Sequence, residues 1–194
     1  MAVWLVVAVI LILGGTALVV LYRGLSTGAV TIDVGWGRRV RPLGPTTVRI
    51  GAPREAVFEL LAQPYLGRAT RAIQEKVQVL ERGADMVLAA HRTQVNKRLT
   101  AVTVETVRLI RPERIDFRLV RGPVPHVVEY FQLDADGAGA TRLEYRGELG
   151  TDGWAVGAWW GRSVAGAWER AVESSLAAVK AEAERRAAGP PQQR

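Results

Sequence analysis

The chain opens with a continuous apolar stretch. Residues 1–22 contain no charged side chain, and residues 3–21 are almost entirely Val, Leu, Ile, Ala and Gly. About twenty apolar residues match the thickness of the hydrocarbon core of a bilayer. Trp4 and Tyr22 stand near the two ends of the stretch, where aromatic rings favour the membrane interface. We therefore predict a transmembrane anchor over residues 1–22.

A cleaved signal peptide is the alternative interpretation of this stretch. It would require a basic segment ahead of a shorter apolar core, whereas only Met1 and Ala2 precede Val3, so the pattern favours the anchor. Arg23 and the arginines at 38–41 flank only the C-terminal side of the stretch. The positive-inside rule then predicts a single-pass protein of the cell membrane with its C-terminal domain in the cytoplasm.

Residues 23–45 are rich in Gly and Pro, a composition that predicts a flexible linker. The short run at 29–34 either adds a strand to the edge of the following domain or belongs to this linker. One domain is expected over residues 46–188, and residues 189–194, which begin Gly-Pro-Pro, are expected to form a disordered tail.

The pattern over residues 46–188 combines strands with helices at the two ends of the domain. A strand runs directly into a short helix over residues 48–61, where Pro53 suits the first turn and Glu55 complements the helix dipole. A second helical piece is expected over residues 65–72. Strand patterns bounded by turn residues follow at 75–80, 86–95, 99–110, 114–120, 126–133 and 141–149.

The last element is predicted to be a long amphipathic helix from Trp154 to about Arg186. Apolar residues recur along it at three- or four-residue spacing, and charged residues fill the other side. The spacing predicts that one stripe of the helix packs on the strands before it.

Three features of this order resemble the SRPBCC superfamily, the START-like or helix-grip proteins that include polyketide cyclases and lipid-transfer domains. They are the strand-to-helix segment Ile50-Gly-Ala-Pro-Arg-Glu-Ala-Val-Phe58, the segment Gly139-Ala-Thr-Arg-Leu143 at the last strand, and the long terminal helix. The resemblance implies an α+β fold in which a curved antiparallel sheet grips the long helix, with an apolar cavity between them. It does not fix the function, because the superfamily supports many functions.

Composition limits the kinds of site that this chain can form. The chain has no cysteine, which excludes disulfides and thiolate metal sites, and its two histidines, His91 and His126, show no metal-binding spacing. The formal net charge is +7, yet the arginines around residues 108–121 lack the aromatic interleaving of a nucleic-acid module. We therefore expect no metal, no cofactor and no nucleic-acid partner.

Candidate ligand-binding residues come from strand alternation and from the tryptophans of the terminal helix. The alternative for those tryptophans is plain core packing or, for Trp154 and Trp159, contact with a membrane interface. A one-residue error in strand register would send every strand side chain to the other face. The candidates nearest the expected cavity are Phe117, Tyr130, Tyr145, Trp159 and Trp168.

Polar groups that face inward would offer acid/base chemistry or simple hydrogen bonds. The candidates are His126, Glu129, Tyr130, Tyr145 and Arg118. Since no nucleophile or cofactor loop is recognisable, we assign no catalytic residue and expect membrane-anchored binding of a hydrophobic small molecule, such as a lipid, an isoprenoid or a polyketide-like compound. An aromatase/cyclase-type enzyme and a ligand-free scaffold remain as alternatives.

Overall fold

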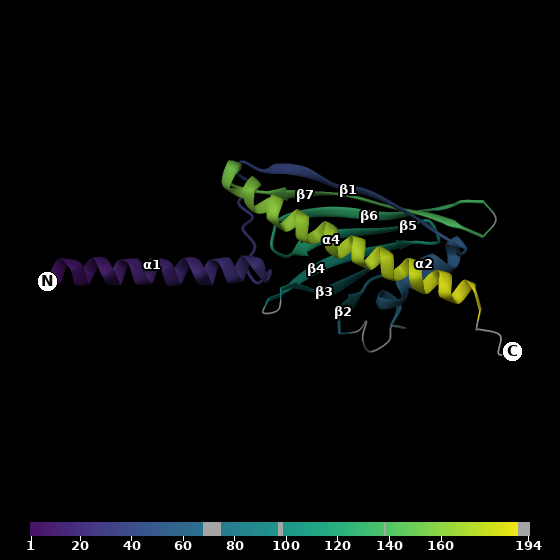
Figure 1. Cartoon of the computed structure of the whole chain (residues 1–194), viewed down its shortest axis with the longest axis horizontal. Helices are drawn as coiled ribbons and strands as arrows, with labels where there is room; N and C mark the ends of the chain where they lie inside the picture. The colour runs from purple at the N-terminus through teal and green to yellow at the C-terminus, as the bar shows by residue number, and fades with distance from the viewer. Residues whose placement is uncertain (68–74, 97–98, 138, 190–194) are drawn as a thin grey trace.

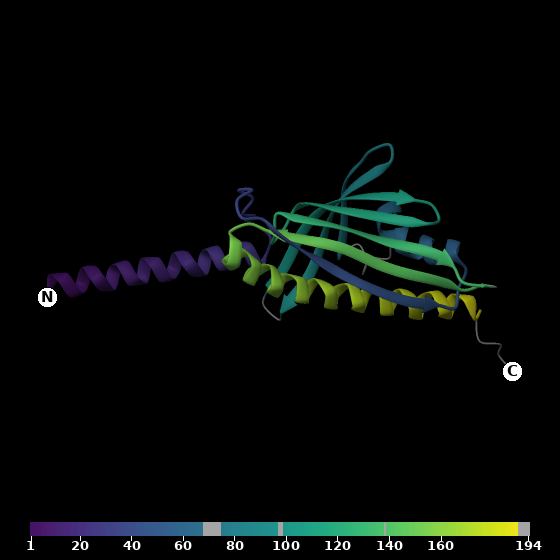
Figure 2. The same ribbon diagram turned by 90° about the horizontal axis from the view of Figure 1, so that it is seen from above.

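Seven antiparallel strands form one curved sheet, and the long C-terminal helix lies across it (Figures 1 and 2). The computed structural model describes residues 1–67, 75–96, 99–137 and 139–189. The strands are β1 (Arg39–Ile50), β2 (Val77–Arg82), β3 (Met86–Asn96), β4 (Leu99–Ile110), β5 (Arg114–Arg121), β6 (His126–Ala135) and β7 (Thr141–Thr151). Their order across the sheet is β1-β7-β6-β5-β4-β3-β2.

Four helical segments occur in the described part of the chain. They are α1 (Ala2–Ser26), α2 (Arg54–Ala62), the 3-10 helix η1 (Gln63–Leu66) and α4 (Trp154–Ala187). The expected α+β helix-grip architecture is therefore confirmed. The helical piece expected over residues 65–72 begins earlier, as η1, and its residues from 68 onward lie outside the described part of the chain.

The face of α4 that meets the sheet changes character along the helix. Near the N-terminus it consists of Gly157, Gly161 and Ala165, whereas larger Val172 and Leu176 are buried further along. A Cβ added at Gly161 would lie 3.0 Å from the hydroxyl oxygen of Thr151 and 3.5 Å from the Leu149 side chain, so the helix backbone approaches the end of β7 closely. This half of α4 is packed through small residues, which leaves its first tryptophans outside.

The helix α1 lies apart from the domain at the N-terminal end of the molecule (Figure 1). An 18-residue window within it has a mean hydropathy of 2.8, and none of that window is buried. By length and composition, α1 is apolar enough to cross a membrane.

The segment between α1 and β1 differs from the expected flexible linker. The Thr31 hydroxyl donates a 2.6 Å hydrogen bond to the carbonyl oxygen of Gly122, and the backbone N–H groups of Val34 and Gly35 donate to Asp152. Arg38 also bonds Asp152 and holds the pKa of that carboxyl down, at about 2. The sheet itself begins at residue 39, before the expected boundary at 46, because β1 pairs with β7 from Arg39 opposite Thr151 onward.

Candidate functional site

A group of polar and charged side chains lies within the core, on the face of the sheet that packs against the helices. We call it the polar cluster: Tyr65 of η1, His91 of β3, Thr103 and Glu105 of β4, Glu129 of β6, Tyr145 of β7 and Trp168 of α4. Glu105 is 4% exposed and Glu129 is 7% exposed. Buried carboxylates need partners, because an unpaired buried charge is costly. The cluster provides these partners in two halves, one around His91 and one around Glu129.

The first half is built around His91. The Tyr65 hydroxyl lies 3.0 Å from Nε2 of His91, and Nδ1 of His91 lies 3.2 Å from Oε2 of Glu105. The Nδ1 atom is not aligned for a hydrogen bond with any described residue, and its contact with Glu105 is an ion pair when the imidazole is protonated. Thr103 donates a 2.6 Å hydrogen bond to the other oxygen of Glu105.

The second half is built around Glu129, whose Oε2 atom accepts two hydrogen bonds. The Tyr145 hydroxyl donates one at 2.6 Å, and the indole N–H of Trp168 donates the other at 2.7 Å. Both donors are neutral groups. The hydrogen bond from Trp168 ties α4 directly to the middle of the sheet.

Aromatic rings connect the two halves. Phe117 lies between the Tyr65 and His91 rings on one side, at 6.0 and 6.4 Å, and Phe131 on the other, at 5.5 Å. Phe131 in turn lies 5.6 Å from Tyr145. The polar groups therefore sit in an aromatic, low-dielectric environment, where electrostatic interactions are strong.

The two carboxylates titrate differently in this environment. Burial, the largest single influence, would raise the pKa of Glu105, but the charge of His91 together with hydrogen bonding to the carboxylate lowers it. Burial alone would lower the pKa of His91, but Glu105 raises it. For Glu129, burial and then the negative charge of Glu105 raise the pKa to about 7. The cluster thus combines a charged pair with a carboxyl that gains or loses a proton near neutral pH.

Three of the five predicted ligand-binding residues come together here. Phe117, Tyr145 and Trp168 belong to the cluster or pack against it. Tyr130 points to the other side of the sheet, where the guanidinium of Arg114 lies 3.8 Å from its ring centroid. Trp159 is 59% exposed on the outside of α4.

The polar residues that were predicted to face inward also lie on different faces of the sheet. Glu129 and Tyr145 face inward, whereas His126 lies on the outer face with Nε2 2.9 Å from Glu148, and Arg118 is exposed. Sequence reasoning missed Tyr65, His91, Thr103 and Glu105 as site residues. The sequence carried no clear signal for Glu105, because Val102 and Val104 make the alternation in β4 favour an outward position for Thr103 and Glu105.

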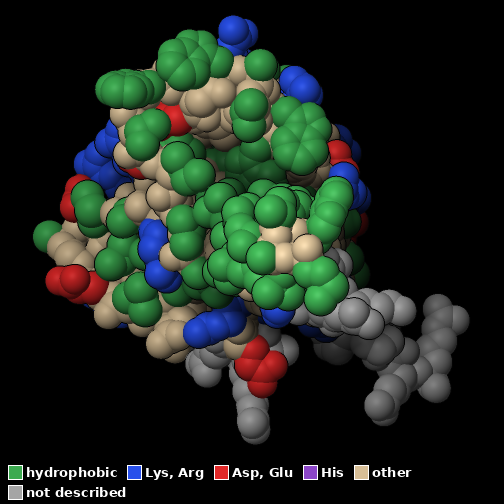
Figure 3. All heavy atoms as spheres, turned by 90° about the vertical axis from the view of Figure 1, so that its left-hand side faces the viewer, with side chains coloured by type: hydrophobic (Ala, Val, Ile, Leu, Met, Phe, Trp, Pro, Cys, Tyr) green, Lys and Arg blue, Asp and Glu red, His purple; other side chains and the backbone are tan. Residues whose placement is uncertain are grey.

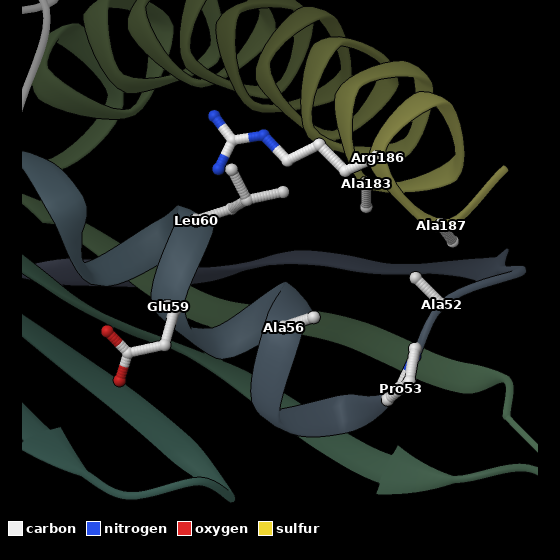
Figure 4. Close-up of a pocket in the computed structure, with 8 residues that line it drawn as sticks. All are labelled: Ala52, Pro53, Ala56, Glu59, Leu60, Ala183, Arg186 and Ala187. Atoms are coloured by element: carbon white, nitrogen blue, oxygen red, sulfur yellow. The ribbon is translucent and has the colours of Figure 1, made fainter. Parts of the chain in front are cut away.

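Two surface pockets lie along α4, and none of the five predicted residues lines either one. The first, of about 240 Å³, lies between α2 and the C-terminal end of α4, where Arg186 extends towards Leu60 (Figure 4). The second, of about 360 Å³, lies between β1 and the first turns of α4. Among the residues that the structure describes, no group of three or more potential metal ligands occurs.

Comparison with known proteins gives a family and a fold. The model of the family described as polyketide cyclase/dehydrase and lipid transport matches residues 45–184. No curated protein matches the chain significantly.

Solved structures share the fold at low identity. Zhui aromatase/cyclase from Streptomyces sp. R1128 is 23% identical with a TM-score of 0.63, over 78% of this chain and 98% of that one. A START superfamily protein from Mycobacterium smegmatis is 14% identical with a TM-score of 0.53, over 75% and 97%. The di-domain ARO/CYC BexL of the BE-7585A biosynthetic pathway is 17% identical with a TM-score of 0.54, over 80% of this chain and 52% of that one.

Proposed function

We propose, from the premise that this chain belongs to the polyketide cyclase/dehydrase and lipid transport family, that its domain binds a hydrophobic small molecule carrying a polar group. The apolar part would lie between the sheet and α4, and the polar cluster would hold the polar group. The α1 helix would anchor the domain on the cytoplasmic side of a membrane, which raises its effective concentration near apolar ligands.

The observation that supports this proposal is the burial of two carboxylates and a histidine in one core. Replacing a buried ion pair by apolar residues of similar volume is often neutral or stabilising. Stability alone therefore gives no reason for Glu105, His91 and Glu129 to lie among aromatic rings. Recognition of a polar group gives such a reason, because a site that hydrogen-bonds its ligand discriminates strongly against analogues lacking that group.

The membrane part of the proposal is supported by α1 and its flanks. The helix is 25 residues long, with Arg23 in its last turn and Arg38 and Arg39 following it. Basic residues on this C-terminal flank favour a cytoplasmic domain.

A second candidate function, an aromatase/cyclase-type enzyme, is favoured by one specific observation. Glu129 is a buried carboxyl with a pKa raised to about 7, the range in which a general acid or base works best at neutral pH. The nearby Tyr145 hydroxyl, at 2.6 Å, would orient the proton. This candidate predicts turnover of a bound compound that is lost in Glu129→Gln.

The proposal is tested by identifying what the protein carries. The full chain is purified in mild detergent, extracted with organic solvent, and the extract is analysed by mass spectrometry beside a detergent blank. We expect a stoichiometric apolar compound with a hydrogen-bonding group, depleted in Glu129→Leu. Glu148→Leu on the outer face of the sheet is the matched control and retains the compound. A wild-type extract identical to the blank, with no binding of apolar fluorescent probes, would favour the ligand-free scaffold.

A further inference from the structure

The end of the domain beside α1 presents large apolar side chains to solvent. Trp36 precedes β1, and Trp154, Val156 and Trp159 lie in the first turns of α4; their exposed fractions are 73%, 59%, 77% and 59%. Seen from this end, hydrophobic side chains lie beside and above the end of α1, with basic side chains around their edge (Figure 3). A contiguous patch of exposed apolar side chains often marks a site of interaction with a membrane or another molecule.

Local structure holds these tryptophans on the outside. Two backbone hydrogen bonds, from Gly153 to the carbonyl of Trp36 and from Trp154 to that of Gly37, join the two segments. The ring of Trp154 packs directly on Gly37, where an added Cβ would lie 2.4 Å from it. Trp154 also has φ of 50°, a left-handed conformation that is unfavourable for residues other than glycine. The fold therefore holds Trp154 in an unfavourable backbone conformation, although its exposed ring contributes little to the core.

Three arginines lie beside this apolar surface. Arg39 and Arg41 of β1 and Arg162 of α4 line the pocket of about 360 Å³ described above. In the described part of the chain, no carboxylate forms an ion pair with any of them, and Nε of Arg41 is buried without a hydrogen bond. The pocket floor includes Leu149 and Ala158. An arginine-lined pocket of this kind fits a phosphate group, which Arg binds through several parallel hydrogen bonds.

The position of α1 brings this surface to the membrane. The Tyr22 ring lies 6.3 Å from the ring of Trp160, and the carbonyl of Thr27 accepts a 2.9 Å hydrogen bond from the N–H of Val102. Ser26, the last residue of α1, is buried against the domain. The C-terminal end of α1 and the exposed tryptophans are therefore at the same end of the molecule (Figures 1 and 2).

We propose that this end of the domain docks on an anionic bilayer, with Trp36, Trp154 and Trp159 in the interface and the arginine-lined pocket around a lipid phosphate. This inference rests on the anchoring role proposed for α1. Tryptophan favours the depth of the headgroups, and arginine is attracted to the negative surface of the cytoplasmic leaflet. Docking would add to the contacts between the end of α1 and the domain in holding the domain in one orientation on the membrane.

The test uses the full chain, whose lack of cysteine allows a single labelling site. A polarity-sensitive fluorophore is attached in Val156→Cys and, as the matched control, in Ala188→Cys at the far end of the same helix, about 48 Å away at 1.5 Å per residue. Each protein is reconstituted into vesicles of phosphatidylcholine alone or with phosphatidylglycerol, containing lipids that carry a quencher at headgroup depth. Flotation after alkaline carbonate reports separately whether α1 is inserted.

The proposal predicts quenching at position 156 in anionic vesicles and none at position 188. Quenching falls in zwitterionic vesicles, in high salt, which screens the arginines, and in the triple variant Arg39→Gln, Arg41→Gln, Arg162→Gln. If the triple variant does not fold, the salt titration of the protein with its three arginines intact still tests their role.

Absence of quenching at position 156 in an inserted protein overturns docking and leaves the anchor intact. Quenching that is independent of lipid charge and salt overturns the role assigned to the arginines. Loss of flotation after carbonate instead contradicts the anchor.

Discussion

The two buried glutamates of the cluster share a residue type, a sheet face and nearly complete burial, yet they differ in charge state. Glu105 has a histidine at 3.2 Å, and its pKa is lowered. Glu129 accepts hydrogen bonds from two neutral groups of the described residues, Tyr145 and Trp168, and its pKa is raised to about 7. The comparison teaches that two neutral donors do not offset burial and the nearby charge of Glu105 at Glu129, whereas an adjacent cation together with hydrogen bonding does offset burial at Glu105.

The consequence is a division of roles within one cluster. In the Glu105 half, the carboxylate already has two partners, His91 and Thr103. The Glu129 half contains a carboxyl that can donate or accept a hydrogen bond according to its protonation state. We therefore expect the ligand's polar group to meet Glu129, and the predictions below separate the two halves.

The largest effect is expected from breaking the ion pair. His91→Leu leaves Glu105 buried without a cation, which should lower the free energy of unfolding by about 3–5 kcal/mol. The double variant His91→Leu, Glu105→Leu should recover most of this loss, because both charges are then gone. Urea unfolding of the detergent-solubilised full chain at pH 7, followed by near-UV circular dichroism, measures both.

The matched control for that prediction is His126→Leu on the outer face, where His126 contacts the half-exposed Glu148. We expect a change within about 1 kcal/mol. A loss as large as that of His91→Leu would contradict the assignment of the buried pair.

The next largest effect is a fall of stability with rising pH. The pKa of Glu129 is raised in the folded state, so the folded protein holds a proton that the unfolded chain releases above about pH 4.5. Stability should decline from about pH 5 and level off above about pH 7, by up to about 3 kcal/mol. The raised pKa of His91 acts in the same direction, because its contribution is lost as pH rises through the folded value.

Glu129→Gln sharpens this prediction, since it removes the titrating group and keeps its shape. We expect the slope of unfolding free energy against pH between 5 and 7 to decrease markedly in the variant. An unchanged slope would assign the pH dependence to His91 alone.

A smaller effect is expected from Trp168→Phe. The substitution retains an aromatic ring and removes the indole N–H that bonds Glu129, so stability should fall by about 1–2 kcal/mol. The pKa of Glu129 should rise further, which a shift of the pH–stability curve to higher pH would report. A curve that stays in place would show that the bond is not formed in solution.

The smallest effect is expected from Trp159→Ala. Trp159 is exposed, so its truncation should change the unfolding free energy in detergent by about 0.5 kcal/mol or less. Trp168→Ala, which removes a half-buried ring of the core, should cost several times more. Equal losses would contradict the different positions of these two tryptophans on α4.

The sequence predicted the order of elements and much of the fold. Strand alternation placed Phe117 and Tyr145 correctly on the inner face, because the neighbours of each alternate clearly between apolar and polar. In β6 the pairs Val127-Val128 and Tyr130-Phe131 are both apolar, so the alternation is ambiguous there. The structure resolves it by turning Phe131 inward and Tyr130 outward.

The tryptophans of α4 were harder to place for another reason. Hydrophobic periodicity gives weight to large apolar side chains, whereas the first turns of α4 meet the sheet through Gly157 and Gly161. The backbone of α4 approaches the sheet so closely that glycine occupies these positions, and Trp159 lies on the outer side of the helix. The cluster residues Tyr65, His91 and Glu105 come from three separate elements, and only the folded sheet brings them together.

The most direct test of the central claim, that Glu129 recognises a polar group on an apolar ligand, compares two probes that differ in one hydroxyl. The affinities of naphthalene and 2-naphthol are measured by calorimetry for the wild-type chain and for Glu129→Leu in identical nanodiscs, so that partitioning into lipid cancels. The account predicts that the wild type binds 2-naphthol about tenfold more tightly than naphthalene, the equivalent of one hydrogen bond, and that Glu129→Leu loses this preference while still binding naphthalene. Equal wild-type affinities for the two probes, or a preference that survives in Glu129→Leu, would contradict it.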